Sequence, residues 1–292
     1  MSYHLLAAGR PAWQHLIGIL TVGVGWLIGS AVIYGVGDAA GLTDPRLLLA
    51  LDFAAVAALL PATWLTVRVL QRRGLGTLSS VAGRLRWGWL ARCATVAAPV
   101  AAVLLVAGLW VDPAGGHLVG AGAVVRTLAA LLLLVPLQAA AEEYAFRGYL
   151  LQAFASLHPA VLRDEHPRTV QAMWPMPWVP ILLQAVMFAA MHGWGTPWGF
   201  ADLVAFGAVA GWLTVRTGGL EAGIALHVLN NLAAAVQMAL LGQLRIDETA
   251  ADLPWPMVAI DVPVLVIYAA VITRLARRVT PAGPVEPVAA PA

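Results

Sequence analysis

Long apolar runs alternate with short polar connections along this chain, and the pattern predicts membrane-spanning helices. A helical span needs about 17–25 mostly apolar residues. Eight runs fit that length, at residues 13–36, 47–70, 88–111, 122–146, 179–195, 199–216, 220–242 and 256–275. The pattern therefore predicts an all-α integral membrane protein with about eight transmembrane helices.

The composition supports this class. Hydrophobic residues make up 61% of the chain and charged residues 11%, with a mean hydropathy of +0.81. Soluble domains carry about 25% charged residues. The single cysteine, Cys93, excludes an intrachain disulfide and a multi-cysteine metal cluster. Because every basic residue is arginine, Schiff-base and serine–lysine chemistry are excluded.

The arginines predict the orientation, because cytoplasmic connections are enriched in basic residues. One set of alternate connections and the termini carry Arg10, Arg68, Arg72, Arg73, Arg84, Arg86, Arg92, Arg163, Arg168, Arg216, Arg274, Arg277 and Arg278. The other side carries Arg46 and Arg245, with Arg126 near the start of span four. Both termini are therefore expected in the cytoplasm.

The chain shows no internal repeat and is expected to form one polytopic membrane domain over residues 1–278. The chemistry-bearing core lies at about residues 120–242. Residues 279–292 are rich in proline and alanine and are expected to be disordered. A polar, proline-rich connection covers residues 158–178.

Three charged residues lie at the end of span four, in the stretch AAAEEYAFRGYLL. A charge at membrane depth costs roughly 2.5–3.5 kcal/mol on insertion scales. These residues therefore need oppositely charged partners or a functional role. Glu143 and Arg147 have the i, i+4 spacing of a helical ion pair. Glu142 has no cation nearby in the sequence, which suits a general base or a metal ligand.

Two later predicted spans also carry polar residues within apolar sequence. Phe188 and His192 are spaced i, i+4 at the end of span five, and His227 and Asn231 share that spacing in span seven. A single histidine in a membrane helix often only forms a hydrogen bond to a neighbouring helix. Polar groups on three spans favour one shared intramembrane cavity, in which each satisfies another. A kink at Pro136 would bring Glu142 level with His192.

Two chemistries suit such a cavity. Glu142 and a histidine can hold and deprotonate water, while a second histidine and an asparagine amide donate to an oxyanion. Alternatively, Glu142, His192 and His227 can ligate Zn²⁺ with an open fourth position. Both routes lead water to attack an amide carbonyl.

Three motifs, Glu-Glu-x-x-x-Arg (142–147), Phe-x-x-x-His (188–192) and His-x-x-x-Asn (227–231), resemble those of the type II CAAX prenyl endopeptidases. The wider group is the CPBP intramembrane proteases, also called the Abi family. The resemblance covers about residues 120–242. It implies an intramembrane endopeptidase with a cytoplasm-facing cavity, and the family fits both a metalloprotease and a metal-free glutamate mechanism.

By motif position, the resemblance implies that Glu142 is the general base and that His192 helps to hold the water. His227 and Asn231 would form the oxyanion site. The supporting residues would be Glu143 and Arg147, which brace the helices, and Phe188 of the second motif.

Other readings of the intramembrane charges remain. A proton-coupled transporter uses such residues, although it usually shows repeated halves. A non-catalytic immunity or scaffold protein is a third candidate. Asp202 and Asp261 are candidate relay groups, although Asp202 follows Gly199 closely and suits the first turn of a helix. No His-Glu-x-x-His motif occurs.

The expected partners are membrane lipids and a membrane-associated peptide or protein substrate, with no nucleic acid. Zinc is one candidate cofactor, and a metal-free mechanism is the alternative. The composition, rich in alanine, valine, leucine and arginine, indicates a bacterial chain of the plasma membrane. A prenylated substrate does not follow from the family name.

Overall fold

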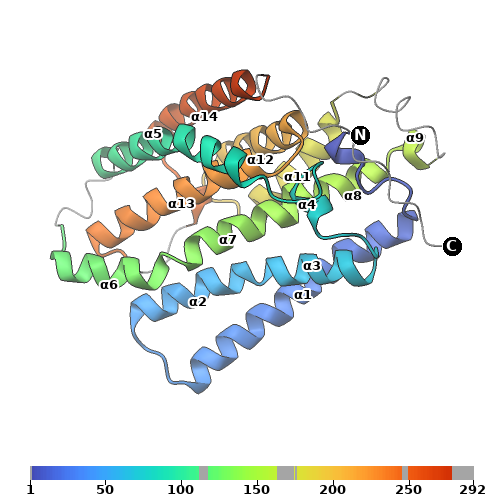
Figure 1. Cartoon of the computed structure of the whole chain (residues 1–292). Helices are drawn as coiled ribbons and strands as arrows, with labels where there is room; N and C mark the ends of the chain where they lie inside the picture. The colour runs from blue at the N-terminus through green and yellow to red at the C-terminus, as the bar shows by residue number, and fades with distance from the viewer. Residues whose placement is uncertain (1, 112–117, 163–173, 175, 245–248, 278–292) are drawn as a thin grey trace.

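The computed structural model describes residues 2–111, 118–162, 174, 176–244 and 249–277. These residues form helices, with no strand beyond an isolated bridge between Ser80 and Gly219 (Figure 1). The helices are η1 (Tyr3–Leu5), α1 (Ala12–Ala39), α2 (Pro45–Ala57), α3 (Leu59–Val69), α4 (Gly76–Ser79), α5 (Trp87–Val111), α6 (Ala121–Leu131), α7 (Leu134–Glu142), η3 (Glu143–Leu150), α8 (Leu151–Ser156), α9 (Pro159–Leu162), α11 (Trp178–Met191), α12 (Pro197–Thr217), α13 (Glu221–Leu241), η4 (Ala250–Asp252) and α14 (Trp255–Ala276). The prediction of an all-α membrane protein is confirmed.

Six helical segments of the described chain are long and apolar enough to cross a membrane. They are α1, α2 with α3, α5, α12, α13 and α14, and the bent segment from α6 to α8 is a seventh candidate. The remaining predicted span is α11, whose 14 residues extend only about 21 Å, less than the ~30 Å hydrocarbon core. The count of eight therefore stays a prediction. The tail 279–292 and most of the connection 158–178 lie outside the described residues.

The fourth predicted span is bent where the sequence suggested. Residues Ala121–Leu131 and Leu134–Ser156 meet at an angle of 43°. Pro136 lies just beyond the break, and a proline ring clashes with the carbonyl of the residue four positions earlier, which here is Leu132. The kink expected at Pro136 is confirmed. Beyond Glu142 the helix widens into the π-helical η3, a form often found at functional sites.

Close packing of α11 against α12 sets the position of the second motif. A Cβ atom at Gly207 would lie 2.8 Å from the Cα atom of Ala185, so only glycine allows this approach. Helix α11 stops at Met191, and Gly193 follows with a positive φ of 87°. His192 therefore lies at the end of a short helix.

The bundle end that bears most of the arginines is covered by residues 75–86. Leu78 and Ser80 are fully buried there. The Ser79 and Tyr144 hydroxyls are hydrogen-bonded at 2.8 Å, and Arg86 Nη2 pairs with Glu221 Oε2 at 2.6 Å. This connection therefore packs over the ends of η3 and α13.

Candidate active site

The two adjacent glutamates take different partners. Glu142 ends α7, and Glu143 begins η3. Glu143 Oε1 pairs with Arg147 Nη1 at 3.1 Å, and both side chains are fully buried. The i, i+4 ion pair predicted from the sequence is confirmed. Since Glu143 is occupied by Arg147, the two carboxylates are electrostatically distinct.

Aromatic rings surround the guanidinium of Arg147. Its Cζ atom lies 4.1 Å from the ring centroid of Phe188 and 5.4 Å from that of Phe206. Cation–π contacts stabilise a cation that has been removed from water. Phe188 thus braces Arg147 as well as contacting His192, whose ring centroid is 4.7 Å away.

His227 lies between the two glutamates. Its Nδ1 atom is 2.9 Å from Glu143 Oε1, and its Nε2 atom is 3.2 Å from Glu142 Oε2. Carboxylates only accept hydrogen bonds. The His227 ring therefore donates to both glutamates only when both of its nitrogens carry hydrogen. In that form, the two negative charges of Glu142 and Glu143 are balanced by Arg147 and His227.

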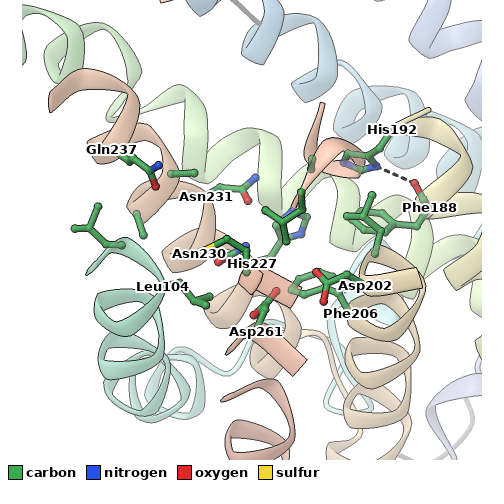
Figure 2. A pocket seen from close by; sticks show the side chains of 17 residues that line it. Leu104, Phe188, His192, Asp202, Phe206, His227, Asn230, Asn231, Gln237 and Asp261 are labelled. Carbon is green, nitrogen blue, oxygen red and sulfur yellow. Dashed lines mark hydrogen bonds between the residues drawn. The ribbon is translucent and has the colours of Figure 1, made fainter. Parts of the chain in front are cut away.

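The tautomer of His192 is set by the backbone. Its Nδ1–H donates to the Phe188 carbonyl oxygen at 2.8 Å, because a carbonyl can only accept (Figure 2). In the neutral ring, Nε2 therefore keeps a lone pair. His192 and the Glu142 carboxylate are also close enough to interact electrostatically.

Asn231 is held through Gln138, a residue that the sequence analysis missed. The Asn231 amide Nδ2 donates to Gln138 Oε1 at 3.0 Å. Gln138 lies one turn before Glu142, so both face the same side of α7. That i, i+4 spacing of a buried glutamine in an apolar run was a usable signal.

A cavity of about 260 Å³ joins these groups. Figure 2 shows His192, His227 and Asn231 around it, together with Asp202 and Asp261. The complete lining is Leu104, Leu105, Phe188, His192, Asp202, Leu203, Phe206, His227, Asn230, Asn231, Ala233, Ala234, Gln237, Ala250, Leu253, Met257 and Asp261. Glu142 is not part of this lining, but it contacts His227, which is. The structure therefore brings the residues of all three motifs together.

The position predicted for Asp202 is wrong. Helix α12 begins at Pro197 and has no acidic residue in its first turn. Asp202 follows in the second turn and lies close enough to Asp261 of α14 to interact with it. Because 59 positions separate the two residues in the sequence, no local pattern could have indicated the pair.

The donor geometry does not fit the zinc alternative. No group of three or more histidine, cysteine, aspartate or glutamate side chains among the described residues is placed to hold a metal ion. His227 shows the reason, since both ring nitrogens face carboxylates and neither lone pair is free for a metal. The ligand set of Glu142, His192 and His227 is thus not assembled.

Comparison with known proteins bears on this same region. Residues 124–233 match the family described as type II CAAX prenyl endopeptidase Rce1-like. The matched segment contains all three motifs and Gln138, whereas Asp261 lies beyond it.

One bacterial relative supports the assignment. The chain is 28% identical over 206 residues to the uncharacterized protein YyaK of Bacillus subtilis (strain 168). The match covers 67% of this chain and 62% of YyaK, which is less than two thirds of that relative's length. No solved structure matches the chain. The chain is thus a multi-pass membrane protein with a segment that is similar to a protease family.

Proposed function

We propose that this chain is an intramembrane endopeptidase that hydrolyses a peptide bond of a membrane-associated peptide or protein. The observation that carries the proposal is that two imidazoles and an amide line one cavity, with the Glu142 carboxylate paired to one of those imidazoles. Hydrolysis there needs no protein nucleophile, because water can be activated in place.

Glu142 is the general base in this proposal. Glu143 has a guanidinium partner and Glu142 does not, so Glu142 is the carboxylate available to take a proton. The nucleophilic water lies between Glu142 and the unprotonated Nε2 of His192. As the water oxygen bonds to the carbonyl carbon, its proton passes to Glu142.

His227 and Asn231 stabilise the oxyanion. The Asn231 amide has two N–H groups, and the contact with Gln138 uses only one. The Nε2–H of His227 faces Glu142 in the resting site and turns to the oxyanion once Glu142 has taken the proton of the water. Donors fixed before the reaction stabilise the developing charge without reorganisation, and one such donor is worth about 10²–10³ in rate. The proton held by Glu142 then passes to the leaving amine as the C–N bond breaks.

The biological setting is part of the proposal. A bacterial plasma membrane fits the composition and the bacterial relative. Membrane-anchored peptides and leader peptides are suitable substrates.

The test is cleavage of a membrane-tethered reporter peptide by purified protein in lipid nanodiscs. Glu142→Gln and His192→Ala should each lower kcat by at least about 100-fold, whereas Asp38→Asn, an exposed site on α1, should retain full activity. A chelator should leave the wild-type rate unchanged. Wild-type rates in both site variants would overturn the proposal.

A further inference from the structure

Asp202 and Asp261 form a second polar feature of the cavity, which the proposed mechanism does not use. Asp202 lies on α12 and Asp261 on α14, and both line the cavity beside His227 and Asn230 (Figure 2). Asp202 is 6% exposed. The two carboxyl groups are close enough to interact with each other.

Burial and proximity fix the charge of the pair. Two carboxyl groups that are close together in a buried site repel each other when both are ionised, so one keeps a proton and the other is negative. The second oxygen of Asp202, Oδ1, has no hydrogen-bond partner among the described residues, although it is buried. A buried acceptor left without a donor is costly. The cavity wall thus contains an unsatisfied acceptor and a negative charge.

Among the described residues, no unmatched cation reaches this part of the cavity. Arg147 and His227 are matched by Glu143 and Glu142. No arginine is among the residues that line the cavity. The negative charge of the aspartate pair is therefore available to a cation that arrives with a ligand.

We propose that Asp202 and Asp261 form a substrate subsite that binds a cationic side chain, arginine or lysine, close to the scissile bond. This inference rests on the proposed function, because it assigns the specificity of the same cavity. As the cation enters, the proton of the pair passes to water, and the N–H groups of the cation then donate to both carboxylates, including Asp202 Oδ1.

The shape and chemistry of the site favour a side chain over other cations. A metal ion needs more donors than the described residues assemble. A guanidinium binds carboxylates with two parallel N–H donors. The cavity, about 260 Å³, is smaller than the ~300–1,000 Å³ typical of pockets for drug-sized ligands. It therefore suits one or two side chains of a peptide.

Specificity for a basic residue follows from the cost of binding a neutral one. A neutral side chain would leave the buried carboxylates unpaired, and sites built to hydrogen-bond a group strongly reject analogues that lack it. Because Asp261 lies outside the Rce1-like segment 124–233, this preference would belong to the present chain and need not extend to the family.

The test uses reporters that differ only in carrying Arg, Gln or Glu at positions flanking the cleaved bond. The wild type should cleave the best Arg reporter with a kcat/KM at least about tenfold above its Gln counterpart. The double variant Asp202→Asn/Asp261→Asn removes the charge and should abolish this ratio. Asp38→Asn, on exposed α1, should keep it. Equal Arg and Gln rates in the wild type, or an unchanged ratio in the double variant, would overturn the subsite.

A binding measurement separates this inference from the proposed hydrolysis. In a Glu142→Gln background, the Kd for an uncleaved Arg peptide should be at least about tenfold below that for the Gln peptide. Adding the two aspartate substitutions should remove this difference. If no reporter is cleaved while the Kd difference is present and lost as expected, the hydrolase proposal fails and the subsite stands. If cleavage depends on Glu142 but neither rate nor Kd depends on the basic residue, the subsite alone fails.

Discussion

Arg147 shows how single residues make a charged site tolerable inside an apolar bundle. Its side chain is fully buried against Glu143 and the rings of Phe188 and Phe206. The sequence predicted the contact with Glu143 because helical spacing is local. It could not predict that His227 bridges the glutamates, since 84 positions separate His227 from Glu143. That contact depends on how α13 packs.

Substitution of Arg147 should therefore destabilise the fold. Arg147→Met leaves Glu143 as a buried charge paired only with His227. Breaking one partner of a buried pair costs about 3–5 kcal/mol. The thermal midpoint in detergent should fall markedly, whereas Arg92→Met, at an exposed position of α5, should change it little. Equal midpoints for the two variants would show that the buried pair contributes nothing to stability.

At the scale of elements, close helix contacts position the motifs. Pro136 made the bend before η3 predictable from the sequence. The widening into a π-helix was not predictable, because it depends on packing around Glu143 and Arg147. The contact of α11 with α12 also escaped the sequence analysis, since a glycine such as Gly207 does not reveal its partner. Hydrophobic patterning specified which segments are helical and left their approach distances undetermined.

Gly207→Ala tests the contact between α11 and α12. The new Cβ atom would lie 2.8 Å from the Ala185 Cα atom, so the helices must separate. Overpacking of this kind costs about 1–3 kcal/mol. We expect a lower thermal midpoint and slower reporter cleavage, because Phe188 and His192 move with α11. Gly35→Ala is the control, since nothing lies within 4 Å of its added Cβ atom. A Gly207→Ala protein as stable and active as that control would refute the contact's role.

At the scale of the whole molecule, the cavity and most of the arginines lie toward opposite ends of the bundle. Arg216 and Arg274 lie in the last turns of α12 and α14. The cavity is lined instead by Ala250 and Leu253, from the connection between α13 and α14. Residues 75–86 cover the arginine-rich end. If the arginines mark the cytoplasm, the cavity is reached from the opposite side. The cytoplasm-facing cavity implied by the family resemblance and the predicted orientation therefore disagree.

Cysteine labelling resolves this disagreement. The native Cys93 is fully buried, so single added cysteines can be labelled against a low background. We expect Gln237→Cys, which lines the cavity, to react with a membrane-impermeant maleimide in intact cells. Arg92→Cys, at the arginine-rich end, should react only in inverted membrane vesicles. Labelling of both positions from the same side would contradict this arrangement.

The central claim is that two adjacent, chemically identical carboxylates do different work, with Glu142 activating water and Glu143 holding Arg147 and His227. The most direct measurement compares Glu142→Gln with Glu143→Gln for single-turnover cleavage of the reporter and for thermal midpoint. Glu142→Gln should lose at least about 100-fold in cleavage rate while keeping its midpoint, and Glu143→Gln should lose stability. Full cleavage by Glu142→Gln, with the rate lost only in a still stable Glu143→Gln protein, would contradict the account.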